Sequence, residues 1–194
     1  MRARPLSLVA FAGLLLLPST SHAGHHLWKF SQLFSNAAGS VQFMQLFTTD
    51  SGEPGVGPFT ITTGSNTFNF VNNLPTSATA NTWILIATSN FAGLKGGVTP
   101  DYVIPASFFS TGGGTLNYAG VDSWSYGAVP TDGVHSLMRD GSTPVNAPTN
   151  FAGQTGSVSL ATSVPAIPTL GIALLIGALL LAGSGLLRRR RRVA

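Results

Sequence analysis

The chain has 194 residues, no cysteine and a formal net charge of +4 at pH 7. Its basic residues are unevenly placed, because seven of the ten Lys and Arg side chains belong to the first four or the last seven positions. Between residues 24 and 166 three cations stand against six carboxylates, which gives this part a net charge of −3. A nucleic-acid partner requires Lys and Arg clustered opposite phosphates, so we expect none, and a chain without cysteine must hold its fold without disulfides.

The first 23 residues have the three parts of an export signal. Two arginines give a positive start, residues 6–17 form an apolar stretch too short to span a bilayer readily, and Ser21 and Ala23 are the small residues that signal peptidase recognises. We therefore expect residues 1–23 to be a signal peptide cleaved between Ala23 and Gly24. An uncleaved anchor and a buried helix are the alternatives.

Cleavage at that bond gives the mature chain the N-terminus Gly24-His25-His26. A free amine, two backbone amides and a third-position imidazole can together enclose a square-planar copper or nickel ion. His25 and His26 are therefore the candidates for a metal ligand, and the alternative is a solvated terminus that holds no metal. We expect no resident metal and no cofactor.

The segment from residue 24 to residue 160 has the composition of an exported all-β domain, with few charges, frequent Gly and Pro, and many Ser, Thr and Asn residues between short apolar runs. Nine short strands separated by turn residues predict a β-sandwich of two sheets. The predicted strands are residues 27–34, 41–48, 59–62, 67–71, 82–88, 102–104, 115–118, 123–126 and 135–138.

Two of these strands carry finer predictions. Trp28, Phe30 and Phe34 alternate along the first strand, so we expect them to face the core together. Residues 43–47 are apolar on both faces, which predicts a central strand covered on both sides.

The same segment resembles the lamin-tail-type domains at its two ends. Residues 30–34 and 41–47 are similar to the opening strands of that family, with glutamine at two positions where the family usually has glutamate. Residues 122–126 and 132–139 look like its closing strands, including the ending "G-x-S-L-x-R". The resemblance implies an immunoglobulin-like sandwich, a fold that serves adhesive, binding and spacer modules alike.

Little in the segment indicates catalysis, and we predict that the protein is not an enzyme. Its one glutamate, Glu53, adjoins Pro54 and Gly55 in a predicted turn, so no pair of carboxylates for acid–base chemistry is expected. His135 stands alone and is expected to bond to the backbone. Backbone capping is the expected role of the five aspartates, Asp50, Asp101, Asp122, Asp132 and Asp140.

The C-terminal part predicts a membrane span. Residues 170–187 are apolar or small except for one serine, and 18 residues rise about 27 Å as a helix, close to the roughly 30 Å of the hydrocarbon core. We expect a linker over 161–169, a transmembrane helix over 170–187 and a basic cytoplasmic tail over 188–194. Five arginines are predicted to hold that tail in the cytoplasm, namely Arg188, Arg189, Arg190, Arg191 and Arg192.

Residues 165–194 also resemble a class of bacterial C-terminal sorting signals, the PEP-CTERM type and its IPTL-CTERM variant. In that class a short Pro-containing motif precedes one transmembrane helix and a terminal arginine cluster. The motif in this chain is Ile167-Pro168-Thr169-Leu170. The resemblance implies a substrate of an exosortase-like transpeptidase in the inner membrane, cut near the motif and then released or attached to the cell surface.

Together these features predict an exported single-pass precursor whose β-domain is structural or adhesive at the cell surface or in the extracellular matrix. Signal peptidase and the sorting transpeptidase are its expected processing partners, and surface polysaccharide is a candidate ligand of its Asn- and Thr-rich loops. One alternative is a permanently anchored surface protein with a ligand- or glycan-binding domain. A secreted hydrolase is the other.

Overall fold

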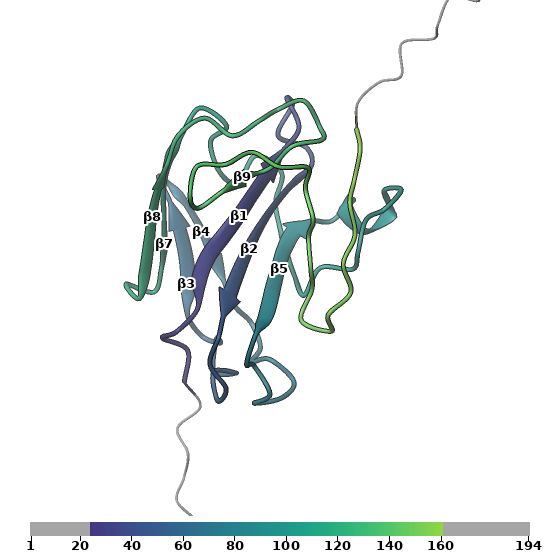
Figure 1. Cartoon of the computed structure of the whole chain (residues 1–194). Coiled ribbons are helices and arrows are strands. Elements are labelled where there is room, and N and C mark those ends of the chain that lie inside the picture. Colours follow the sequence, from purple (N-terminus) through teal and green to yellow (C-terminus); the bar gives the residue numbers. More distant parts are fainter. Residues whose placement is uncertain (1–23, 161–194) are drawn as a thin grey trace, which may run out of the picture. The chain divides into compact units, whose positions relative to one another are not determined.

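A computed structural model of the chain describes residues 24–160. These residues form an all-β sandwich of two sheets, as the sequence predicts (Figure 1). One sheet has five strands in the order β6-β5-β2-β1-β9, and the other has four in the order β4-β3-β7-β8. The strands are β1 (Lys29–Ser35), β2 (Gln42–Thr48), β3 (Thr60–Thr63), β4 (Asn66–Asn69), β5 (Thr82–Thr88), β6 (Tyr102–Ile104), β7 (Gly114–Tyr118), β8 (Asp122–Tyr126) and β9 (Leu137–Met138).

All nine predicted strands are present, and their ends differ from the predicted ends by two residues at most. The last strand is shorter than predicted because His135 forms only an isolated bridge with Val145 before β9 begins. A single 3-10 turn, η1 (Phe91–Gly93), is the one helical element of the described part. Within residues 24–160 no helix has the length and apolar character that a membrane crossing requires.

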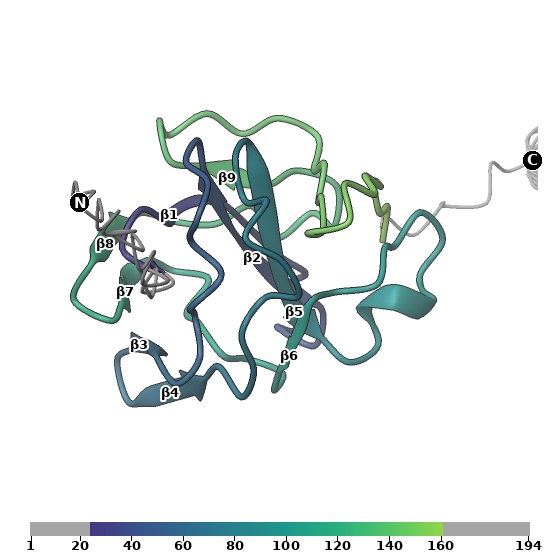
Figure 2. The same ribbon diagram turned by 90° about the horizontal axis from the view of Figure 1, so that it is seen from below.

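The main core lies between the two sheets, which Figure 2 shows in a view from one end of the sandwich. Alternate residues of β1, β2 and β5 meet alternate residues of β3, β7 and β8 there, as the two-residue period of a strand requires. The buried side chains of this core include Trp28, Phe30, Met44, Leu46, Ile84, Ile86, Ile61, Leu116 and Trp124.

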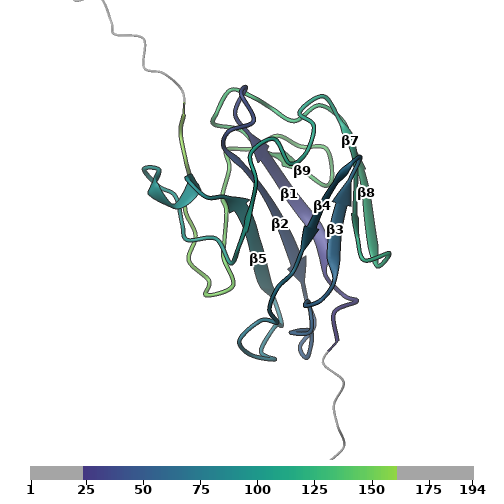
Figure 3. The same ribbon diagram turned by 180° about the vertical axis from the view of Figure 1, so that it is seen from behind.

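Strand β2 lies at the centre of the five-stranded sheet, between β1 and β5 (Figure 3). It is buried on both faces, which confirms the prediction for residues 43–47. On its outer face the ring of Phe43 stacks on Phe34, with centroids 5.2 Å apart, and meets the edge of Phe91 from η1 at 5.4 Å. The chain after β9 covers the same face, since the Gln45 side chain donates to the Thr149 carbonyl over 3.1 Å. This cover allows an apolar strand to be buried on both sides without a third sheet.

The prediction that Phe34 faces the core with Trp28 and Phe30 is wrong. Strand β1 carries a bulge between Phe30 and Gln32, where the pairing with β2 shifts by one residue. A one-residue shift moves every later side chain to the opposite face, so Leu33 enters the core and Phe34 lies on the outer face.

The bulge also places the buried Gln32 on the outer face, where it pairs with the buried Gln45 of β2. Gln32 donates from Nε2 to the Ser136 hydroxyl over 2.6 Å, beside β9, and Gln45 holds the chain after β9 as described above. Both side chains are almost fully buried, at 4% and 2% exposed. Neutral amides avoid the cost of a buried charge at these positions.

The segment that follows β9 is held to the sandwich by side chains that bond to backbone groups. Asp101 accepts the backbone N–H groups of Leu85 and Phe151, and burial raises the pKa of its carboxyl although both of these bonds oppose the shift. Asn146 donates to Val134 O and Val158 O at 2.6 and 2.7 Å. The segment is therefore fixed across the outer face of the five-stranded sheet.

Candidate functional site

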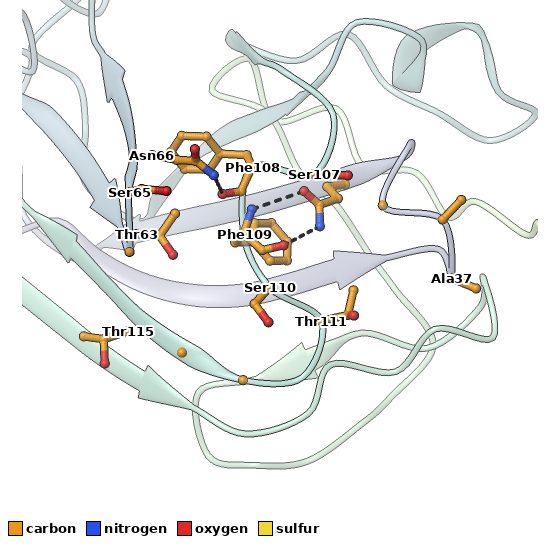
Figure 4. A pocket seen from close by; sticks show the side chains of 16 residues that line it. Ala37, Thr63, Ser65, Asn66, Ser107, Phe108, Phe109, Ser110, Thr111 and Thr115 are labelled. Carbon is orange, nitrogen blue, oxygen red and sulfur yellow. Dashed lines mark hydrogen bonds between the residues drawn. The ribbon is translucent and has the colours of Figure 1, made fainter.

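A cavity lies at the end of the sandwich that carries the β1–β2 hairpin and the β3–β4 turn (Figure 4). It has a volume of about 660 Å³ and is closed on one side by the loop between β6 and β7. Gln42, Thr63, Asn66 and Thr111 are among its lining residues. Loops and strand ends from three parts of the chain therefore meet around one opening.

The cavity wall is fixed by amide side chains. Gln42 is fully buried; its Nε2 donates to Phe109 O over 2.9 Å and to the Ser35 hydroxyl over 3.2 Å, while its Oε1 accepts the Phe109 N–H. Asn66 donates to Phe108 O over 2.7 Å. These bonds tie the loop before β7 to β2 and β4, so the cavity is preformed.

The cavity offers hydroxyl and amide groups and carries no charged side chain in its lining. Its two aromatic residues, Phe108 and Phe109, are 1% and 3% exposed, so their rings face the core rather than the opening. Such a wall can donate and accept hydrogen bonds with a neutral polar molecule, but it lacks the cation that an anionic group needs.

Two buried carboxylates lie elsewhere in the sandwich, and the first is Asp122 on β8. Its Oδ2 accepts the backbone N–H of Phe30 over 2.9 Å, and both oxygens bind the Arg139 guanidinium, with Nη2 to Oδ1 at 2.9 Å. Arg139 also donates to the carbonyls of Phe30 and Ser123. The pair joins the two sheets, whereas the sequence predicted only local backbone capping for Asp122 and did not predict the arginine.

The second buried carboxylate is Glu53, which the sequence placed in a turn. The residue is only 5% exposed, because the loop after β2 folds back against the chain that precedes β1. Its Oε2 accepts the Leu27 N–H over 3.2 Å, its carbonyl accepts the Trp28 indole N–H over 2.8 Å, and its N–H donates to the Thr79 hydroxyl. Among the described residues, no hydrogen bond joins the carboxylates of Asp122 and Glu53.

The candidate metal residues lie beside Glu53. The His25 ring stacks on Phe59, with centroids 3.4 Å apart, and meets the edge of the His26 ring at 4.9 Å. Burial lowers the pKa of His25, the neighbouring His26 lowers it further, and Glu53 opposes the shift. The Gly24 nitrogen donates to Gly52 O over 2.8 Å, a bond that a square-planar metal site would have to break.

Two exposed aspartates cap turns as predicted. Asp132 accepts the backbone N–H groups of His135 and Val134, and these bonds, with one from the His135 ring, lower the pKa of its carboxyl to about 2. The ring of His135 therefore bonds to a carboxylate rather than to the backbone. Asp140 accepts the N–H and hydroxyl of Ser142 in the same manner.

Across residues 24–160 no three His, Asp or Glu side chains come close enough together to hold a metal ion. Several predicted site residues lie outside the described range: Ala23 before the cleavage bond, the motif Ile167 to Leu170, and the arginines Arg188 to Arg192. The cavity itself was not predicted, because its residues come from loops far apart in the sequence and their Ser, Thr and Asn residues are common in any loop.

Comparison of the chain with known protein families, with curated proteins and with solved structures found no match.

Proposed function

We propose that the protein is an exported, non-catalytic module of the cell surface or extracellular matrix, with an immunoglobulin-like sandwich in a structural or adhesive role. The observation that carries this proposal is how the buried polar groups are used. In the described part of the chain, the Tyr118 hydroxyl is the one buried side-chain N or O atom without a hydrogen-bond partner. Polar groups committed to the fold in this way leave few free to act on a substrate.

The sequence order supports the processing that we propose. An export signal with cleavage after Ala23, a cysteine-free β-domain, the motif at residues 167–170, an apolar run and five arginines follow one another along the chain. Signal peptidase would free the N-terminus, and the C-terminus would stay in the cytoplasm until an exosortase-like transpeptidase in the inner membrane cuts near the motif. The alternative is a permanent single-pass anchor.

Intact-mass spectrometry of the protein recovered from the cell envelope tests the sorting step. We expect a species that ends between Ile167 and Leu170, and a variant with alanine at all four motif positions should keep its full tail. A full-length tail in the unaltered protein would contradict sorting and favour the permanent anchor.

A second measurement tests the topology. Replacement of Arg188 to Arg192 by alanine should expose the C-terminus to protease added outside the inner membrane, because the charges that resist translocation are gone. Unchanged protection of the tail would contradict the role of the arginines.

A second candidate function is binding of a neutral glycan in the cavity between the hairpin and the β6–β7 loop. The favouring observation is its preformed wall of hydroxyl and amide groups without charge. A glycan array with the mature protein tests this candidate. Leucine at Ser65 and Thr111 should abolish any binding to neutral glycans, whereas leucine at the exposed Thr143, outside the cavity, should not.

A further inference from the structure

The carboxylate of Glu53 is buried without a cation among the described residues. It is 5% exposed and accepts one backbone N–H, from Leu27. The ion pairs within residues 24–160 join His135 to Asp132 and Arg139 to Asp122, and neither reaches Glu53. A carboxylate that is buried in this way loses its hydration, and one hydrogen bond from a backbone N–H does not replace it.

The backbone of Gly24 lies directly against this carboxylate. A Cβ atom on Gly24 would fall 2.7 Å from the Glu53 carboxyl carbon, closer than real Cβ contacts come. Because N and Cβ are bonded to the same Cα, the Gly24 nitrogen lies within about 5 Å of that carbon. Gly24 is also held on both sides, since its N–H donates to Gly52 O and its carbonyl accepts the Gly55 N–H at 2.9 Å.

We propose that Glu53 is the binding site for the α-ammonium group that cleavage after Ala23 creates on Gly24. The inference rests on the signal cleavage in the proposed function. Hydrolysis adds one water across the Ala23–Gly24 peptide bond, which leaves a carboxylate on Ala23 and an amine on Gly24 that takes up a proton at neutral pH. One N–H of this ammonium keeps the bond to Gly52 O, and the other two are free to bind Glu53.

Of the titratable groups around Glu53, neither His25 nor Tyr118 favours a positive charge, and the side chain of His26 is exposed. Burial and the neighbouring His26 lower the pKa of the His25 ring, which favours its neutral form. Burial raises the pKa of the Tyr118 hydroxyl, and Glu53 adds to this shift, so Tyr118 is also neutral. The α-ammonium is the positive charge that the geometry can bring to this carboxylate.

The pairing makes the folded domain depend on processing. Before cleavage the Gly24 nitrogen is an uncharged amide, and folding must bury Glu53 without a salt bridge from any side chain of residues 24–160. After cleavage the same position provides the charge, so the mature chain gains stability that the precursor lacks. The site thus favours folding after the signal peptide has been removed.

The experiment uses the full chain, exported with its own signal peptide. Insertion of Ser-Asn between Ala23 and Gly24 leaves the residues before the cleavage bond unchanged, adds no second pair of small residues that signal peptidase would recognise, and moves the new amine two residues away from Glu53. Pulse proteolysis at a fixed urea concentration near the unfolding midpoint measures the ratio of folded to unfolded protein. This ratio should be lower by about tenfold or more in the inserted chain than in the unmodified chain. With Glu53→Gln in both chains, the insertion should have little effect.

A pH series on the two chains with Glu53 intact gives a readout that needs no substitution in the core. Pairing with a carboxylate raises the pKa of the amine above its value in the unfolded chain. The stabilisation is then present at neutral pH, where the Glu53 carboxylate is charged, and is lost as the pH rises through the raised pKa of the amine, so the difference between the chains should vanish in alkaline buffer.

N-terminal sequencing of the same samples separates the two ways of failing. A start other than Gly24 in the unmodified chain would overturn the cleavage, and with it this part of the proposed function. A start at Gly24 with an insertion effect that is the same with and without Glu53→Gln, or that does not change with pH, would overturn only the ammonium site.

Discussion

Asp122 and Glu53 are both buried near the N-terminal end of the sandwich, at 6% and 5% exposed, yet their surroundings differ. Asp122 lies where β1, β8 and the chain after β9 meet, and Arg139 binds both of its oxygens. Glu53 lies where the loop after β2 meets the chain before β1, and it has a backbone N–H but no cation among the described residues. The fold itself provides Arg139 as the partner of Asp122, whereas the partner that we propose for Glu53 is the amine that cleavage creates on Gly24.

The largest effect is expected from the pair that the fold supplies. Arg139→Met should lower the free energy of unfolding by about 3 kcal/mol, because it leaves Asp122 buried with a charge and without its partner. Urea denaturation measures this loss. Lys95→Met, at an exposed site, is the control and should change the unfolding free energy by less than about 0.5 kcal/mol. Equal effects for the two variants would contradict the role of the Asp122 pair.

Thr79 positions Glu53 and offers the next test. Its buried hydroxyl donates to Asp50 O over 2.7 Å and accepts the Glu53 N–H over 3.1 Å. Thr79→Val keeps the shape and leaves both backbone groups unpaired, so the expected cost is about 2 kcal/mol. The same exchange at the exposed Thr143 is the control. In the Thr79→Val chain the Ser-Asn insertion should also lower the unfolding free energy less than it does in the unaltered chain, and an undiminished insertion effect would contradict the positioning role.

A smaller effect is expected at Gly24 itself. Gly24→Ala keeps the amine but places a methyl group on the Glu53 carboxylate, which must move, at a cost of about 1 kcal/mol in urea denaturation. Gly93→Ala is the matched control, because nothing lies within 4 Å of a Cβ there. A Gly24→Ala chain as stable as the control would contradict the close approach.

The smallest effect on stability is expected from the titration of an exposed carboxylate, Asp132. Backbone and side-chain bonds from His135 and Val134 lower the pKa of Asp132 to about 2, whereas burial raises that of Asp101 above its ordinary value. The Asp132 contribution is present above the ordinary aspartate pKa and is lost as the pH falls toward about 2. NMR titration of the two carboxyl groups should give a lower pKa for Asp132 than for Asp101. A higher pKa for Asp132 than for Asp101 would contradict the roles given to the hydrogen bonds of Asp132 and to the burial of Asp101.

Strand positions were predictable because alternating apolar residues and turn residues are local signals. The β1 bulge was not, because the two-residue period from Trp28 to Phe34 looks continuous and only the pairing with β2 shifts it. The cover over β2 was predicted as a burial pattern in residues 43–47, but not as the chain after β9, which has too little alternation to indicate where it packs. Local patterns therefore predict elements better than they predict what covers them.

The environment of Glu53 was missed for a related reason. Pro54 and Gly55 correctly indicate a turn, and turns are usually exposed. This one is covered by Gly24 and Trp28, which come from a part of the chain far away in sequence. The sequence shows the predicted cleavage bond and the position of Glu53, but only the fold shows that Gly24 and the Glu53 carboxylate lie together.

N-terminal sequencing of the protein recovered from the cell envelope tests the central claim most directly, because export, processing and the Glu53 site all require the same new terminus. The account predicts a chain that begins Gly24-His25-His26. A chain that still begins at residue 1, or that begins at any residue other than Gly24, would contradict it.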